Sequence, residues 1–75
     1  MASVTLDKNI DKAYTGIWLE SGGDLAVQFK DGSTHIYGGL VKHQEIWGMF
    51  NKVITTGTTI TSSDIYWMKA SIVTS

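Results

Sequence analysis

Residues that could support nucleophilic catalysis lie close together between Asp31 and His35. Ser33 and His35 are two positions apart, which in a strand places both side chains on one side, and Asp31 adds a carboxylate. Asp and Ser beside Gly32 are, however, also what a tight turn requires. The chain has no Cys and no G-x-S-x-G motif. We therefore assign no catalytic residue and predict that the protein is not an enzyme.

Ligands for a metal ion or an anion are equally sparse. His35 and His43 lie in different predicted elements and form neither H-x-H nor H-E-x-x-H spacing. We therefore predict no metal and no cofactor. The pair Gly38-Gly39 precedes a predicted helix, so its backbone N–H groups could hold a small anion. A plain strand-to-helix turn explains the same pair.

Three tryptophans in 75 residues are the best functional lead. Trp is large and rarely fully hidden in a small core, and it is enriched at binding hot spots. Either all three are partly covered core residues, or at least one anchors a partner or ligand. The candidate binding residues are Trp18, Trp47, Trp67, His43, Gly38 and Gly39.

Charge argues against two classes of partner. Six Lys and no Arg are scattered along the chain against seven acidic residues, for a net charge of −1. Binding of long nucleic acids needs a basic cluster, so we expect none, although aromatic stacking could suit a small nucleotide. No apolar run approaches the roughly 20 residues of a membrane helix. The N-terminus lacks the apolar stretch of a signal peptide, so we expect a cytoplasmic protein that binds no membrane.

The length predicts one small domain over residues 1–75, and such a domain has a thin core. Small domains are commonly reinforced by disulfides, a metal or a partner subunit. Without Cys, and with two His, the remaining option is self-association. We therefore expect a homo-oligomer.

The clearest structural signal is the segment 25–37, which alternates apolar and polar residues around Asp31-Gly32 and predicts a β-hairpin. Leu25, Val27 and Phe29 should share one face. A two-residue loop would place Ile36 on the Val27 face, whereas a three-residue loop with a glycine bulge would place His35 and Tyr37 there. The sequence leaves both registers open.

Other β segments surround this hairpin. The segment 14–20 should be a strand with Ile17 and Leu19 on one face and Trp18 on the other, joined through a turn at 21–24 to the strand 25–30 in a first hairpin. Further β segments are expected at 3–6 and 58–61. The segment 64–74 could form a helix capped by Ser62 or Ser63, but its β-branched and aromatic residues favour a final strand.

The segment Lys42–Ile54 has helical spacing and is predicted to form one helix packed across the sheet. Its apolar stripe would consist of Ile46, Met49, Phe50 and Val53, widened by Trp47 and Ile54. Gly48 within this helix would cost about 1 kcal/mol relative to Ala.

With this helix in place, the run from Leu25 to Gly57 resembles the KTSC domain, a small domain of bacteria and phages. The pattern is an alternating strand, a Gly turn at Gly32, a Y-x-Y strand at His35-Ile36-Tyr37, a Val near the helix start at Val41, and A-x-S-x-G after the helix at residues 53–57. Departures are Lys42 for Pro, His35 for the first Tyr, and Val53 and Thr55 for Ala and Ser, and residues 64–75 have no counterpart. The resemblance favours the three-residue loop and implies no activity.

These features together predict an α+β domain, with an antiparallel sheet of four or five strands and one helix on one face. We expect a phage or bacterial accessory protein that binds, and inhibits, a larger protein partner through an aromatic patch. The alternative is a small-molecule or nucleotide binder with the ligand held at a homo-oligomer interface.

Overall fold

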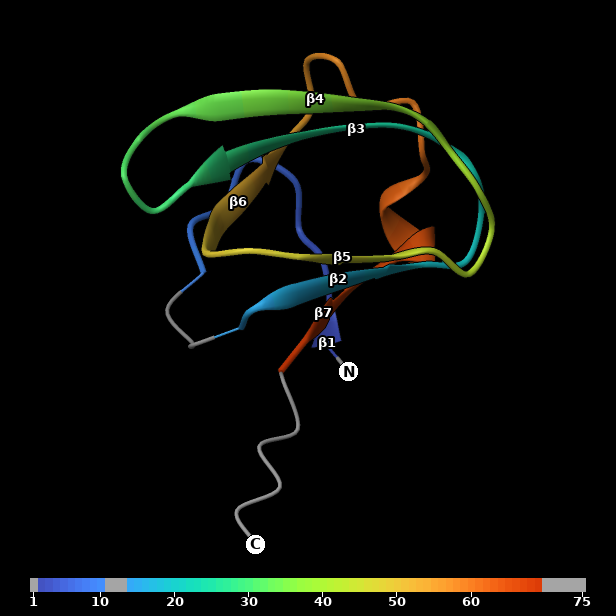
Figure 1. Ribbon diagram of the computed structural model, residues 1–75, viewed down its shortest axis with the longest axis horizontal. Helices are drawn as coiled ribbons and strands as arrows, with labels where there is room; N and C mark the ends of the chain where they lie inside the picture. Colours follow the sequence, from blue (N-terminus) through green and yellow to red (C-terminus); the bar gives the residue numbers. More distant parts are fainter. Residues whose placement is uncertain (1, 11–13, 70–75) are drawn as a thin grey trace, which may run out of the picture.

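The computed structural model describes residues 2–10 and 14–69, and two antiparallel sheets form nearly all of its regular structure (Figure 1). Sheet A has the strand order β1 (Ala2–Ser3), β7 (Ile65–Met68), β2 (Gly16–Leu19) and β5 (Glu45–Trp47). Sheet B has the order β4 (Thr34–Leu40), β3 (Gly23–Phe29) and β6 (Phe50–Ile54), and a 3₁₀ turn, η1 (Ser62–Asp64), precedes β7. The predicted α+β class is wrong, because the described residues contain no α-helix and a second sheet lies where the helix was expected.

The segment 42–54, predicted as a helix, instead forms a turn, β5, a bend and β6. Gly48 lies at the bend, where a Cβ atom would come within 3.2 Å of the Phe50 ring. Trp47 and Met49 belonged to the predicted buried stripe, yet they are 50% and 57% exposed. Backbone curvature around Gly48, together with the β-forming residues on either side, therefore decides against the helix.

A β-bulge explains how helical spacing arose without a helix. The register of β6 against β3 shifts between Lys52 and Phe50, so Asn51 is an extra residue on β6. Phe50 and Val53, three residues apart, can therefore share the inner face, and both are fully buried. Ile46 faces the same core from β5, across the bend.

The core lies between the inner faces of the two sheets. Alternation along β2 is confirmed, since Ile17 and Leu19 are fully buried while Trp18 is only half-buried on the opposite face. The buried apolar side chains of the two inner faces are Ile17, Leu19, Ile46, Ile65 and Trp67 from sheet A, and Leu25, Val27, Phe50 and Val53 from sheet B.

The bend at residues 20–22 connects the two sheets and does not close a hairpin. The predicted pairing of the segments 14–20 and 25–30 is therefore wrong: β2 pairs with β5 and β7, whereas β3 pairs with β4 and β6. Gly22 permits this crossing, because a Cβ on it would lie 2.6 Å from the carbonyl oxygen of Leu40.

β3 and β4 form the expected hairpin, and the structure decides its register. Val27 pairs with His35, and the N–H of Phe29 donates to the carbonyl oxygen of Ser33 at 2.8 Å, which leaves a three-residue loop. Gly32 ends this loop with a φ of +91°, as a glycine bulge requires. His35 thus lies on the Val27 face, but it remains exposed because β4 is the edge strand.

The C-terminal part of the chain is only partly as expected. Of the predicted strand 64–74, residues Ile65–Met68 form β7, and residues 70–74 lie outside the described residues. The segment 58–61 is a loop, although its Thr59 exchanges hydrogen bonds of 2.9 Å with the backbone of Asp24.

The outer edge of β6 is covered by the N-terminal segment. The N–H of Asp7 donates to the carbonyl oxygen of Val53 at 2.7 Å, and the N–H of Ile10 donates to that of Asn51 at 2.8 Å. The Asp7 carboxylate also accepts hydrogen bonds from the backbone N–H and the hydroxyl of Thr55. These bonds fasten residues 7–10 along the strand.

This fastening predicts a dependence of stability on pH. The hydrogen bonds from Thr55 hold the pKa of Asp7 below its ordinary value. A carboxyl with a lowered folded-state pKa stabilises the fold above its unfolded pKa of about 3.9, and this contribution is lost as the pH falls through the folded pKa. Asp7→Asn should lower the urea midpoint at pH 6, and the difference from wild type should shrink as the pH falls through the folded-state pKa of Asp7.

Asn is the appropriate replacement because Asp7 has a φ of 60°, which Asn tolerates. The Ser33 hydrogen bonds likewise lower the pKa of Asp31, but that group is common to both proteins and cancels in the comparison. A difference between the two midpoints that stays constant from pH 6 to pH 2 would contradict the role given to Asp7.

Candidate functional site

The outer face of sheet A carries large side chains that point away from sheet B. In the strand register Trp18 stands opposite Tyr66 on one side and Glu45 on the other. Gly16, two residues earlier on the same face, stands opposite Trp47 and Met68. We call Trp18, Trp47, Tyr66 and Met68 the aromatic face.

Trp18 is held in a fixed orientation on this face. Its ring stacks on that of His43 with centroids 5.3 Å apart and planes 18° from parallel. Its indole N–H donates to Glu20 at 2.9 Å, and the other oxygen of Glu20 lies 3.7 Å from Nε2 of His43. His43 has a φ of 66° at the turn before β5, which brings the imidazole back over the strand. The predicted site residues Trp18 and His43 are thus in contact.

Trp47 lies across the glycine opposite it. A Cβ on Gly16 would come within 2.6 Å of two carbons of the Trp47 ring and within 3.1 Å of the Met68 methyl group. The ring therefore occupies the space that a side chain at position 16 would fill, beside a nearly buried Met68. Half of Trp47 still faces solvent, so it is the most exposed member of the aromatic face.

Two acidic side chains lie beside Trp18 on the aromatic face. Glu45 is exposed directly beside Trp18, and Glu20 holds the Trp18 indole from the strand end. Among the strand residues that the register places on this face there is no lysine. The face therefore combines aromatic surface with negative charge.

Trp67 is not part of the aromatic face. It points inward from β7, is 2% exposed, and packs against Phe50 with ring centroids 6.3 Å apart. Tyr14 stacks on its other side at 6.1 Å. Trp67 is therefore a core residue, whereas Trp18 and Trp47 reach the surface.

Gly38 and Gly39 do not adjoin a helix, so the premise of the anion-binding interpretation is wrong. Both lie in β4, where the register against β3 shifts around Asp24. Gly39 has a φ of +67°, and its N–H donates to the Asp24 carboxylate at 3.2 Å. The pair forms a bulge, and one of its amides is already occupied by a carboxylate.

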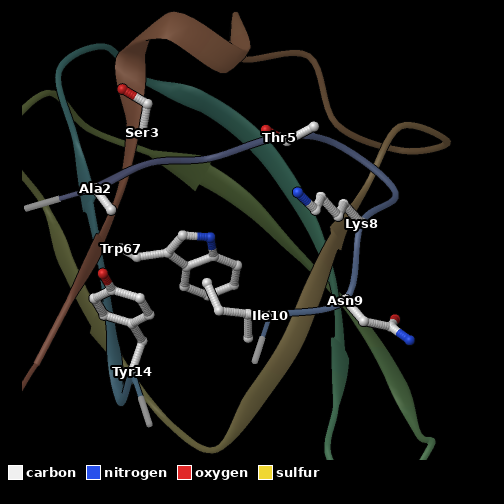
Figure 2. A pocket seen from close by; sticks show the side chains of 8 residues that line it. All are labelled: Ala2, Ser3, Thr5, Lys8, Asn9, Ile10, Tyr14 and Trp67. Atoms are coloured by element: carbon white, nitrogen blue, oxygen red, sulfur yellow. The ribbon is translucent and has the colours of Figure 1, made fainter. Parts of the chain in front are cut away.

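A pocket of about 210 Å³ opens on another part of the surface, between β1 and the N-terminal loop (Figure 2). Figure 2 shows the Trp67 indole between Tyr14 and Ile10. The Lys8 side chain extends over the opening toward the side of the Trp67 indole that carries its nitrogen. The lining residues are Ala2, Ser3, Thr5, Lys8, Asn9, Ile10, Tyr14 and Trp67.

A second hollow shares Ala2, Tyr14 and Trp67 with this pocket and extends it toward Lys69. The Lys69 ammonium lies 5.8 Å from the centre of the Tyr14 ring, within the range of a cation–π contact. Lysines thus stand at both ends of a Tyr14–Trp67 stack. No carboxylate is among the described residues that line either hollow.

Ser33 and His35, which the sequence placed near Asp31, do not contact each other in a hydrogen-bonded set. The Ser33 hydroxyl donates to Asp31 at 2.6 Å, and His35 instead contacts Tyr37 edge to face at 4.6 Å. Within residues 2–10 and 14–69 no three His, Asp or Glu side chains gather in a way that could hold a metal ion. No helix in this part of the chain is long and apolar enough to cross a membrane.

Several residues of these surfaces were not among the predicted site residues. Tyr66 joins Trp18 because β7 is the neighbour of β2, and this pairing brings together segments that are distant in the sequence. Tyr14, which precedes β2, and Lys8, which follows β1, lie near Trp67 because both of these strands pair with β7. The alternation that placed Trp18 on an outer face was visible in the sequence, whereas its neighbours on the adjacent strands were not.

The different burial of the tryptophans predicts different costs of truncation. Trp67→Ala should destabilise the fold by about 3–5 kcal/mol, since it removes a large side chain that is 2% exposed and packs against Phe50. Trp47→Ala should cost only about 0.5 kcal/mol, as for a surface substitution. Urea unfolding followed by circular dichroism measures both values. Equal losses for the two variants would show that Trp47 supports the core after all.

Comparisons of the chain with family models, with curated proteins and with solved structures found no match. The resemblance to the KTSC domain therefore stays a prediction, and the surfaces described above carry the functional argument.

Proposed function

We propose that the protein is a non-catalytic binding module that docks a basic segment of a protein partner on the aromatic face. The observation that carries this proposal is the position of Trp47, half exposed and laid across Gly16 next to a Trp18 ring that is already fixed. Trp is enriched among the few residues that carry most of the binding energy at protein interfaces. Docking would cover the bound surface of the partner, and this is how a small module could inhibit a larger protein.

Preorganisation supports this role. His43 and Glu20 already hold the Trp18 ring, so little side-chain freedom is lost when a partner binds. Neither Trp18 nor Trp47 lines the two hollows described above; both stand on the outer surface of a sheet, which suits a peptide or protein surface better than a small molecule.

Charge supports a basic partner. Lys or Arg side chains can stack on the exposed indoles, with a gain of about 0.5–1 kcal/mol at exposed positions. Glu45 and Glu20 are placed to pair with the same cations. Such pairs on an interface rim guide association and depend on salt concentration.

Selection of peptides from a random phage-displayed library against the immobilised protein tests the proposal. Selected peptides should place Lys or Arg beside an apolar or aromatic residue. A synthetic peptide of the selected sequence should bind Trp47→Ala or Trp18→Ala at least 30-fold more weakly, which corresponds to a loss of about 2 kcal/mol. Glu45→Lys should weaken the same peptide, and added salt should weaken the wild type.

Met49→Ala is the matched control, because Met49 is a similarly exposed apolar residue at the bend before β6, outside the aromatic face. It should bind the peptide as the wild type does. If the selected peptides are acidic, or bind all four variants equally, the aromatic face is not the docking surface.

The pocket beside Trp67 supports a second candidate function, the binding of a small organic anion. Lys8 and Lys69 at its two ends, without a carboxylate in the described lining, favour a carboxylate or phosphate group. Tyr14 and Ile10 offer an apolar wall for a flat ring. A mononucleotide combines both features.

Adenosine monophosphate, with adenosine as its uncharged counterpart, tests the pocket. The monophosphate should raise the melting temperature of the wild type and adenosine should not, because a ligand that binds the folded state stabilises it. Lys8→Ala should abolish the shift, and Lys30→Ala, at the distant hairpin loop, should preserve it. A shift that survives Lys8→Ala would place the ligand elsewhere.

A further inference from the structure

β4 is a long edge strand whose outer side no described segment covers. It is the terminal strand of sheet B, it has seven residues, and Figure 1 shows it near the top of the molecule, with the loop that follows β6 rising above part of it. The opposite edge of the same sheet, on β6, is closed by the backbone hydrogen bonds of residues 7–10. The terminal strands of sheet A have only two and three residues. One edge of sheet B is thus covered by the N-terminal segment, whereas the other edge is open among the described residues.

The hydrogen-bond alternation tells which backbone groups of β4 point outward. The N–H of Phe29 bonds to Ser33, so the residues of β4 in step with Ser33, namely His35 and Tyr37, bond to β3. On β3 the intervening Ala26 directs its N–H the other way, to the Thr58 hydroxyl beside β6. The N–H and C=O groups of Thr34 and Ile36 therefore face away from the sheet.

Edge strands usually carry features that prevent pairing with another strand, such as Lys, Pro or an inward-pointing charge. β4 reads THIYGGL and has no Lys, Arg, Asp, Glu or Pro. Ile36, at the centre of its straight part, is 60% exposed. Its irregularity is confined to the bulge at Gly38-Gly39, so the strand from Thr34 to Tyr37 stays open to a partner strand.

We propose that β4 pairs with β4 of a second copy of this chain, antiparallel and with Ile36 on the two-fold axis. The outward N–H and C=O of each Ile36 bond to those of the other copy, and Thr34 of each copy lies opposite Gly38 of the other. The three-stranded sheet B becomes one continuous six-stranded sheet. The aromatic face belongs to sheet A and remains free in this dimer.

The strand is complementary to itself in this register. The two-fold axis places the exposed Ile36 side chains beside each other, where each also rests against Gly57 and Ala26 of its own copy. On the other face, His35 stands opposite Tyr37 of the second copy, which repeats the edge-to-face contact that the two residues make within one chain. No two charges of equal sign oppose each other. Strand pairing without side-chain repulsion therefore favours a second copy over an unrelated chain.

The chain also has few other means of stabilisation. It contains no Cys, and its described residues form no cluster able to bind a metal. Subunit association is the usual remaining reinforcement of a domain of this size. An interface of one strand pair is small, so the dimer should form at high micromolar concentration and dissociate on dilution.

Sedimentation equilibrium from 10 µM to 1 mM tests the dimer. The average mass of the wild type should rise toward twice that of the chain. Ile36→Lys and Ile36→Glu should each stay monomeric and folded, because Ile36 is exposed and equal charges would meet on the axis. An equimolar mixture of the two should regain dimers at the wild-type concentration or below.

A single engineered cysteine tests the register. Because the natural chain lacks Cys, Ile36→Cys can form a disulfide only with a second copy. Opposed residues of an antiparallel pair have Cα atoms about 5.5 Å apart, which suits a disulfide. Under diamide Ile36→Cys should cross-link at least tenfold faster than Thr34→Cys, whose counterpart on the second copy is Gly38.

Either experiment can overturn the proposal. A wild type that stays monomeric at 1 mM, or a dimer whose dissociation constant is unchanged in Ile36→Lys, excludes pairing through β4. Faster cross-linking of Thr34→Cys than of Ile36→Cys excludes the register centred on Ile36.

Discussion

The burial of one inner sheet face against the other is the constraint on which the rest of this structure depends. Phe50 stands at the middle of this layer, stacked on Phe29 at 5.4 Å and tilted against Trp67. Since strands alternate their side chains, each residue that the core takes from β2, β5 or β7 places its neighbour on the outside of sheet A. The aromatic face is therefore a consequence of the core: Ile17 and Leu19 turn inward, and Trp18 must turn outward.

A domain with so thin a core depends on how its sheet edges are closed. The N-terminal segment closes β6 through Asp7 and Ile10, and a Thr58 hydroxyl bridges β3 and β6 where their ladder ends. β4 has no such cover among the described residues, and the side chains along it include no Lys, Arg, Asp or Glu. Pairing of β4 with a second copy would cover this remaining edge with a strand from another molecule.

The surfaces proposed for binding lie on different sides of the fold, and the aromatic face meets the extension of the Trp67 pocket only at Met68. The aromatic face lies on the outside of sheet A, the Trp67 pocket lies at the β1 end between the strand and the N-terminal loop, and the proposed dimer uses the edge of sheet B. A dimer would therefore display two aromatic faces. Two linked sites can hold a partner with repeated basic segments more tightly than one site alone.

The local patterns of this sequence were sufficient for the hairpin, for the alternation that buries Leu25 and Val27, and for the outward position of Trp18. Alternation and turn chemistry depend on residues close in the chain. The helix at 42–54 was wrong because a bend at Gly48 and a bulge at Asn51 interrupt a period of two and leave a spacing of three and four. Only the tertiary structure decided that Trp67 fills the core, that Tyr66 joins Trp18, and that Gly38-Gly39 is a bulge held by Asp24. These outcomes depend on which strands pair, and strand pairing is set by contacts between segments far apart in the chain.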